Sequence, residues 1–242
     1  MGNIVEFNHL NAGYGRIQIL NDLSFAVEEG QVYGVIGPNG SGKSTMFNAL
    51  LGIIRPTSGA IWFDSIDITR TPPHVRCRMG IGRTFQIPRP FENMSVYENV
   101  LVAAVHGTGQ SEKKAGHAAI DALKLTGLYD KRELLSGELP LLDRKRLEVA
   151  RAIGTQPKLL LLDEVAAGLT DAEVKDMMKL VKSLKDSGYS IIWIEHIIQT
   201  MLGSTDRLMC MAEGSCVMEG EPQEVISSKT VQTLYLGVDD DE

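Results

Sequence analysis

An eight-residue segment near the N-terminus has the residue types that hold nucleotide phosphates. It matches the pattern G-x-x-x-x-G-K-[ST] in full and reads Gly37-Pro38-Asn39-Gly40-Ser41-Gly42-Lys43-Ser44. An apolar run, residues 32–36, precedes it, and helical spacing follows from Ser44, as the pattern requires. Glycines let backbone N–H groups turn toward phosphate oxygens, and the N-terminus of the following helix adds partial positive charge. We expect Lys43 to reach the β- and γ-phosphates, Ser44 to ligate Mg²⁺ and Thr45 to contact the α-phosphate.

Two acidic residues, Asp163 and Glu164, follow a run of four leucines, residues 159–162. Such a run is typical of a strand buried on both faces, and ligands of open α/β sheets bind at the carboxyl ends of the strands. We expect Asp163 to hold Mg²⁺ through water and Glu164 to polarise or deprotonate an attacking water. The alternative is a solvated Asp-Glu turn without a ligand, which the phosphate-binding segment disfavours.

Three further side chains are candidates for the same chemistry. His196 follows the next apolar run, residues 190–194, and could donate a hydrogen bond to a γ-phosphate. Gln86 lies at a predicted strand-to-loop exit in residues 83–86, where it could contact Mg²⁺ and the attacking water. Tyr14 lies in a predicted glycine turn and could stack on adenine. A structural histidine and an exposed turn tyrosine are the alternatives for His196 and Tyr14.

The surrounding pattern predicts the elements that position these residues. Strands are expected at residues 4–10, 23–27, 32–36, 60–63, 159–162 and 190–194. Helices are expected from 44 to 51, from about 71, within 92–135, at 147–153 and 172–185, and from about 197. Strands that alternate with helices on this scale indicate an α/β fold with a mostly parallel sheet. Residues 92–135, with breaks at 107–109 and 127, are expected to form an inserted helical part.

Composition excludes several classes of protein. The chain has 242 residues, of which 43% are hydrophobic and 23% charged, so disorder and coiled coil are excluded for the chain as a whole. The net charge of −7 argues against a nucleic-acid partner. The three cysteines have no C-x-x-C spacing, which favours free thiols in a reducing compartment. No apolar stretch approaches the length of a membrane span, so we expect a soluble cytoplasmic protein with a frayed acidic tail at 238–242.

Together these motifs resemble those of the ATP-binding subunit of an ABC transporter, over nearly the whole chain. The resemblance implies a P-loop NTPase core with an N-terminal antiparallel β subdomain and an inserted helical subdomain, in one domain over 1–242. The core with its β subdomain would span about 1–90 and 141–220, the helical subdomain about 91–140, and a C-terminal extension 221–242. The resemblance assigns catalysis to Lys43, Gln86, Glu164 and His196. It assigns the nucleotide to Tyr14 and residues 37–45, and Mg²⁺ to Ser44, Gln86 and Asp163.

The resemblance also implies partners. Two ATP-binding subunits would form a head-to-tail dimer that binds two ATP with Mg²⁺, on the cytoplasmic face of the membrane. Transmembrane permease subunits would dock near residues 87–100, and a solute-binding protein outside the membrane would complete the system.

Four stretches are similar to the ATPases of branched-chain amino-acid importers in particular. They are residues 80–91, 94–100, 147–152 and 234–237. Importers of urea, amides or related small polar solutes share these features, so the solute stays open. An export ATPase of the lipopolysaccharide type also has a single cassette, but residues 83–86 favour an importer. A DNA-repair or translation ATPase is disfavoured by the single cassette and the negative net charge.

The signature motif departs from the family pattern. Its place is taken by residues 139–143, Leu-Pro-Leu-Leu-Asp, where the family has L-S-G-G-Q or L-P-Y-G-Q. We expect Leu142 to add bulk and Asp143 to bring negative charge toward the γ-phosphate of a partner's ATP. Milder departures are Val165 and Thr170. An intact partner signature would rescue one site of a heterodimer, so a heterodimer is favoured over a homodimer. The alternative is a nucleotide-gated regulatory subunit with weak hydrolysis.

Overall fold

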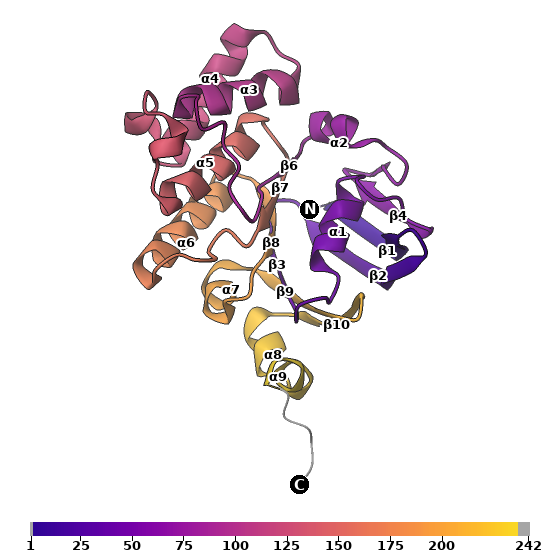
Figure 1. The fold of residues 1–242 in the computed structure, drawn as a ribbon. Coiled ribbons are helices and arrows are strands. Elements are labelled where there is room, and N and C mark those ends of the chain that lie inside the picture. The colour runs from indigo at the N-terminus through magenta and orange to yellow at the C-terminus, as the bar shows by residue number, and fades with distance from the viewer. Residues whose placement is uncertain (1, 237–242) are drawn as a thin grey trace. The chain divides into compact units, whose positions relative to one another are not determined.

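The computed structural model describes residues 2–236, which divide into two compact units (Figure 1). Unit 1 contains the residues up to Arg76 and those from Ile192 onward, and unit 2 contains residues 77–191. The acidic tail at 238–242, for which fraying is expected, lies outside the described residues. No helix among residues 2–236 is long and apolar enough to cross a bilayer.

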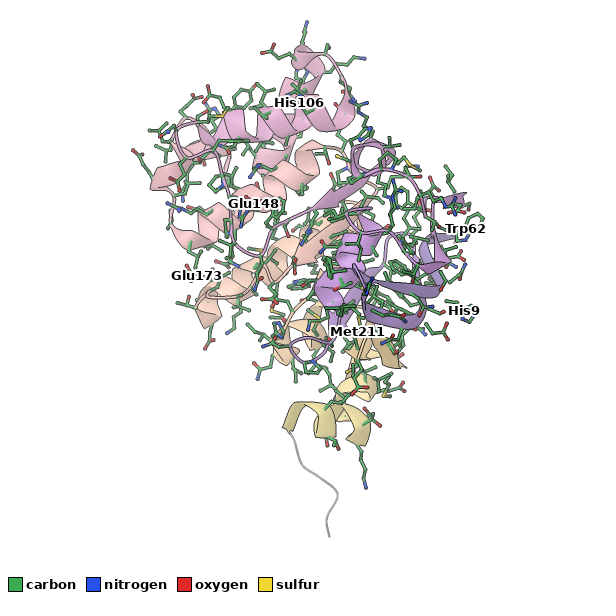
Figure 2. The ribbon with its side chains drawn as sticks, turned by 45° about the vertical axis from the view of Figure 1, so that its right-hand side comes forward. His9, Trp62, His106, Glu148, Glu173 and Met211 are labelled. Carbon is green, nitrogen blue, oxygen red and sulfur yellow. The ribbon has the colours of Figure 1, made fainter. Side chains whose placement is uncertain are left out.

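Unit 1 contains a four-stranded antiparallel sheet in the order β2-β1-β4-β5. Its strands are β1 (Asn3–Tyr14), β2 (Ile17–Glu28), β4 (Ser58–Phe63) and β5 (Ile66–Asp67). The predicted turn at 11–15 is wrong, because β1 continues to Tyr14, which pairs with Ile17. Register shifts between Phe7 and Gly13 interrupt the alternation of apolar residues, so the pattern hides the second part of this strand. His9 and Trp62 lie on the exposed side of the sheet (Figure 2).

The rest of unit 1 carries the phosphate-binding segment. Strand β3 (Val32–Ile36) pairs in parallel with β9 (Arg207–Ala212), and β9 pairs antiparallel with β10 (Ser215–Gly220). The helices are α1 (Lys43–Leu50), α7 (Ile198–Ser204), α8 (Pro222–Ser227) and α9 (Lys229–Leu236). The bounds predicted for β3 are confirmed, whereas β9 and β10 escaped sequence analysis. Five of the six residues of β9 are buried, and only Arg207 is exposed, so the strand shows no alternation of apolar and polar residues.

A buried arginine secures the far end of α1. Arg76 belongs to α2 (Pro73–Met79), and its guanidinium donates to the carbonyl oxygens of Ala49 and Leu50, both at 2.8 Å. It also donates to the carbonyl of Thr71 at 2.8 Å. Burial lowers the pKa of Arg76 to about 10. A cation at the C-terminus of a helix is favourable because unsatisfied carbonyls gather there, so Arg76 stabilises the helix that begins with Lys43.

Unit 2 combines two parallel strands, β6 (Ile81–Arg83) and β7 (Leu159–Asp163), with four long helices. These helices are α3 (Val96–Thr108), α4 (Glu112–Leu125), α5 (Leu141–Gly154) and α6 (Asp171–Asp186), and two short 3₁₀ helices, η1 (Tyr129–Lys131) and η2 (Ser136–Glu138), precede α5. Helices α3, α4 and α5 pack against one another, and a left-handed Gly109 ends α3. Figure 2 labels His106 on α3, Glu148 on α5 and Glu173 in the first turn of α6. Strand β8 (Ser190–Ile194) crosses the division between the units.

Two helix starts show why the local sequence works. Ser95 and Glu98 form a capping box at α3, and Thr170 and Glu173 form another at α6. These contacts lower the pKa of both glutamates, because each carboxylate accepts hydrogen bonds from its cap residue. Each box satisfies backbone N–H groups that have no partner within the helix. Thr170 therefore has a local structural role at the position where the sequence departs from the family pattern.

Candidate functional site

The phosphate-binding segment connects β3 to α1 within unit 1. The ammonium of Lys43 is buried, and it donates to the carbonyl oxygens of Gly37 at 2.7 Å and Pro38 at 3.0 Å. The hydroxyl of Ser41 lies 3.4 Å from the same nitrogen. The loop therefore curls around its own lysine, which places a positive charge inside a ring of backbone.

Two glycines are required by the shape of this loop. A Cβ on Gly37 would lie 2.2 Å from the carbonyl oxygen of Met211, and Gly37 has φ +153°. Gly42 is the N-cap of α1 with φ +102°, and no side chain caps the helix there. A helix N-terminus without a side-chain cap carries partial positive charge that favours an anion. Asn39, Gly40 and Ser44 are exposed, whereas Thr45 is buried.

Tyr14 ends β1 and is 48% exposed. Its hydroxyl accepts a hydrogen bond of 2.8 Å from the side-chain amide of Asn48, which lies on α1. The predicted position in a turn is wrong, but the ring remains accessible for stacking. Asn48 links the tyrosine to the phosphate-binding helix, and sequence analysis gave no sign of this contact.

His196 follows β8 and belongs to unit 1. It is exposed, while the preceding Glu195 is 1% exposed and accepts a hydrogen bond from the Trp193 indole at 3.3 Å. The backbone N–H of Glu195 donates to the carbonyl of Val35 at 3.3 Å, one residue before β3 ends. His196 therefore emerges at the same strand ends as the phosphate-binding segment, as the prediction requires.

In unit 2, Asp163 ends β7 and Glu164 begins the following turn. The Asp163 side chain is 6% exposed, and Glu164 is partly exposed with φ +49°. A positive φ in a residue with a Cβ is strained and persists only where neighbours hold it. One such neighbour is the buried Lys145 of α5, whose ammonium donates to the Glu164 carbonyl at 2.9 Å.

Gln86 meets Glu164 directly, with 2.5 Å between the Gln86 amide nitrogen and a Glu164 carboxylate oxygen. Sequence analysis placed both residues in one site, and unit 2 brings them together. It missed Lys145 and also Arg83, whose guanidinium lies 2.9 Å from the Asp163 carboxylate. The only signals in the sequence were the basic residues themselves, Lys145 in the helix after the signature segment and Arg83 shortly before Gln86. A lysine or an arginine at these positions does not by itself indicate a contact with Asp163 or Glu164.

In the signature segment, residues 139–143, the side chain of Asp143 points into the protein. Its carboxylate is buried and forms ion pairs with Lys131 and with Arg146, the latter at 3.7 Å. The expectation that Asp143 brings negative charge toward the γ-phosphate of a partner's ATP is therefore wrong, because two cations of the same unit neutralise its carboxylate. Leu141 is exposed and Leu142 partly exposed at the start of α5, so the apolar bulk at this position remains.

Comparison with protein families identifies the class. The family model described as ABC transporter matches residues 20–167, which is more than half of the chain, so the chain belongs to this family. A crystal structure of a nucleotide-free ATP-binding cassette from an ABC transporter matches with a TM-score of 0.90 and 30% identity, covering 98% of this chain and 100% of the other. A cassette in its ADP conformation matches with the same values. The P-loop α/β fold is confirmed, and the chain is a nucleotide-binding ATPase.

Relatives from two kinds of transport system match nearly the whole chain. The probable branched-chain amino acid transport ATP-binding protein LivG of Archaeoglobus fulgidus is 36% identical, over 99% of this chain and 97% of its own. The corresponding BraF of Pseudomonas aeruginosa is 33% identical, over 97% and 98%. The lipopolysaccharide export ATP-binding protein LptB of Acidithiobacillus ferridurans is 33% identical, over 98% of each chain. The predicted resemblance to branched-chain amino-acid transport ATPases is confirmed.

Proposed function

We propose that this chain hydrolyses ATP to drive an importer of branched-chain amino acids or a related small polar solute. The observation that carries the catalytic part is the contact of Gln86 with Glu164, 2.5 Å apart at the end of β7. The similarity to LivG and BraF supports the solute class, and residues 83–86 support import over export.

Each candidate residue then has a role in hydrolysis. Lys43 and the N–H groups around residues 37–45 bind the phosphates, and Tyr14 stacks on the adenine. Glu164 polarises the attacking water, Gln86 orients it, and His196 donates a hydrogen bond to the γ-phosphate. Ser44, Gln86 and Asp163 offer the hard oxygen ligands that suit Mg²⁺. When bound, Mg²⁺ neutralises charge on the phosphates.

A docking face for a permease subunit is formed by exposed apolar side chains of unit 2. They are Phe85, Ile87, Phe91, Leu134 and Leu135. Two segments of this face are joined by a hydrogen bond from the N–H of Gly137 to the carbonyl of Glu92 at 3.2 Å. The buried Asn99 side chain accepts from the N–H of Phe91 at 2.8 Å and donates to the hydroxyl of Ser136 at 3.2 Å.

This face is connected to Glu164 through Gln86. It starts at the residues that flank Gln86, so docking there would act on the residue that contacts Glu164. We therefore place the chain in the cytoplasm, peripheral on the inner face of the membrane, with permease subunits and a solute-binding protein as partners. Nucleic acid is not among the proposed partners.

A second ATPase subunit completes the assembly in this proposal. The apolar Leu141 and Leu142 lie at the start of α5, and Leu142 stands where the family has the glycine that allows close approach to a phosphate. A heterodimer with an intact-signature partner is favoured over a homodimer for this reason. The same observation supports the alternative function, a regulatory subunit that binds ATP and hydrolyses it weakly.

Steady-state ATPase activity of the purified chain tests the catalytic part. We expect ATP binding with slow turnover alone, and about 100-fold less turnover for Glu164→Gln, because the water loses its base. Glu112→Gln, an exposed change on α4, is the matched control and should match the unmodified chain. Fast turnover by the chain alone would contradict the heterodimer. Turnover that Glu164→Gln leaves unchanged would contradict the role of Glu164.

The transported solute needs a separate test. Cells that lack this chain should take up radiolabelled leucine more slowly than cells that carry it. Unchanged leucine uptake would contradict the branched-chain amino-acid proposal, and uptake of urea or amides would then test the related solutes.

A further inference from the structure

Residues 83–86 run alongside the Asp163–Glu164 turn and contact both of its carboxylates. Strand β6 pairs in parallel with β7, with Arg83 opposite Leu161. Beyond this pair, the guanidinium of Arg83 lies 2.9 Å from Asp163, and the amide of Gln86 lies 2.5 Å from Glu164. The pairing of two neighbouring strands thus places a fixed cation on the carboxylate that is proposed to hold Mg²⁺.

Asp163 does not depend on Arg83 for its backbone position. Its N–H donates to the hydroxyl of Thr84 at 3.1 Å, and the N–H of Thr84 donates to the carbonyl of Leu161 at 2.9 Å. These bonds and the β6–β7 pairing hold the end of the strand. What Arg83 adds is charge, delivered to a carboxylate that is almost fully buried.

A buried carboxylate without a nearby cation is strongly unfavourable. Arg83 supplies that cation, since a guanidinium is well suited to pair with a buried carboxylate. The side chains of Arg83 and Asp163 are 17% and 6% exposed, so solvent screens this pair weakly. A divalent cation that binds the same carboxylate would be repelled by the guanidinium at close range.

We propose that Arg83 is an internal counter-ion that takes the place of the divalent cation on Asp163 and weakens its affinity for that cation. This inference rests on the proposed function, in which Asp163 contributes to the Mg²⁺ site. Arg83 keeps the metal-free protein stable, and its repulsion of the metal favours release of Mg²⁺ with the product. A positioning role for Arg83 predicts the opposite effect on metal affinity, so the two roles differ in sign.

The test compares Arg83→Met with the intact chain in two measurements. The first is the melting temperature of the full chain without metal or nucleotide, which should fall by about 5 °C because Asp163 loses its partner. The second is the affinity for Mn²⁺ in the presence of ADP, measured by electron paramagnetic resonance, which should rise about fivefold. Arg78→Met removes a charge from an exposed position on α2 and should change neither value.

Arg83→Lys and Arg83→Gln separate charge from hydrogen bonding. The Arg83→Lys variant keeps the charge and should retain weak Mn²⁺ binding. The Arg83→Gln variant removes the charge and should bind Mn²⁺ more tightly, and it replaces Arg83→Met in the test if that variant fails to fold. Weaker or unchanged Mn²⁺ binding in the neutral variants would overturn the proposal.

Asp163→Asn distinguishes this failure from a failure of the proposed function. It should weaken Mn²⁺ binding, and combined with Arg83→Met it should recover part of the lost melting temperature, because no buried charge is left unpaired. If Asp163→Asn binds Mn²⁺ as tightly as the intact chain, the metal role of Asp163 fails, and with it the effect of Arg83 on metal affinity. The stability effect of Arg83 is measured independently of that outcome.

Discussion

The phosphate-binding loop of unit 1 and the Asp163–Glu164 turn of unit 2 are held in place by different means. The buried ammonium of Lys43 donates to the carbonyl oxygens of Gly37 and Pro38, six and five residues away in the chain, and the loop depends on glycine backbone. The turn instead relies on side chains from distant segments: Arg83 lies 80 residues from Asp163, and Gln86 lies 78 residues from Glu164. A loop built from its own backbone should fail when a Cβ is added, and a turn held by side chains should fail when one of them is shortened.

Gly37→Ala should have the largest effect, because the added Cβ is incompatible with the backbone geometry of the loop. The new Cβ would lie 2.2 Å from the carbonyl oxygen of Met211, which requires the loop or β9 to move. We expect a loss of about 3 kcal/mol in the free energy of unfolding and loss of measurable ATP binding. Chemical denaturation and fluorescent-nucleotide titration measure the two quantities.

Gly30→Ala is the matched control for that change. Gly30 has φ +76° but nothing lies within 4 Å of a Cβ placed there. It should cost about 1 kcal/mol from backbone strain and leave ATP binding intact. Equal effects of the two alanines would show that strain alone, and not the contact with Met211, governs the loop.

Lys145→Met should have an intermediate effect, because it removes one support of the turn. The carbonyl of Glu164 loses a charged donor at 2.9 Å, and the strained backbone at φ +49° relaxes. We expect kcat to fall about tenfold while KM for ATP changes less than about twofold, because the phosphate loop is untouched.

Lys179→Met on the exposed face of α6 is the control and should leave kcat unchanged. Lys145→Arg should restore part of the lost rate, because it keeps a cationic donor. A rise in KM without a fall in kcat would show that Lys145 serves nucleotide binding and not the turn.

Tyr14→Phe should have the smallest effect, because it removes only an exposed hydrogen bond at the edge of the loop region. The ring loses its 2.8 Å bond to Asn48 but keeps its face for stacking. We expect ATP affinity to fall about twofold for Tyr14→Phe and about tenfold for Tyr14→Ala. Calorimetry with ATP measures both, and inorganic triphosphate should bind all three proteins equally. Unchanged ATP affinity in Tyr14→Ala would show that adenine does not meet this ring.

The contrast between loop and turn also explains which predictions from sequence were correct. Strand β3 and helix α1 were predicted to within one residue, and β8 with its full bounds, because apolar runs and flanking glycines mark them locally. The second part of β1 was missed because register shifts interrupt its alternation, and β9 because five of its six residues are buried in succession. The roles of the individual site residues in ATP chemistry stay predictions.

By itself, the sequence determined the class of the protein and the identity of its phosphate-binding loop. Both follow from contiguous residues whose chemistry depends on near neighbours, such as Lys43 and the glycines around it. Tertiary structure decided the rest. It forms the ion pairs of Asp143 with Lys131 and of Asp163 with Arg83, and the hydrogen bond from Lys145 to the carbonyl of Glu164. Such pairs depend on strand register and helix packing, which join residues far apart in the chain, and no local pattern of residue types specifies them.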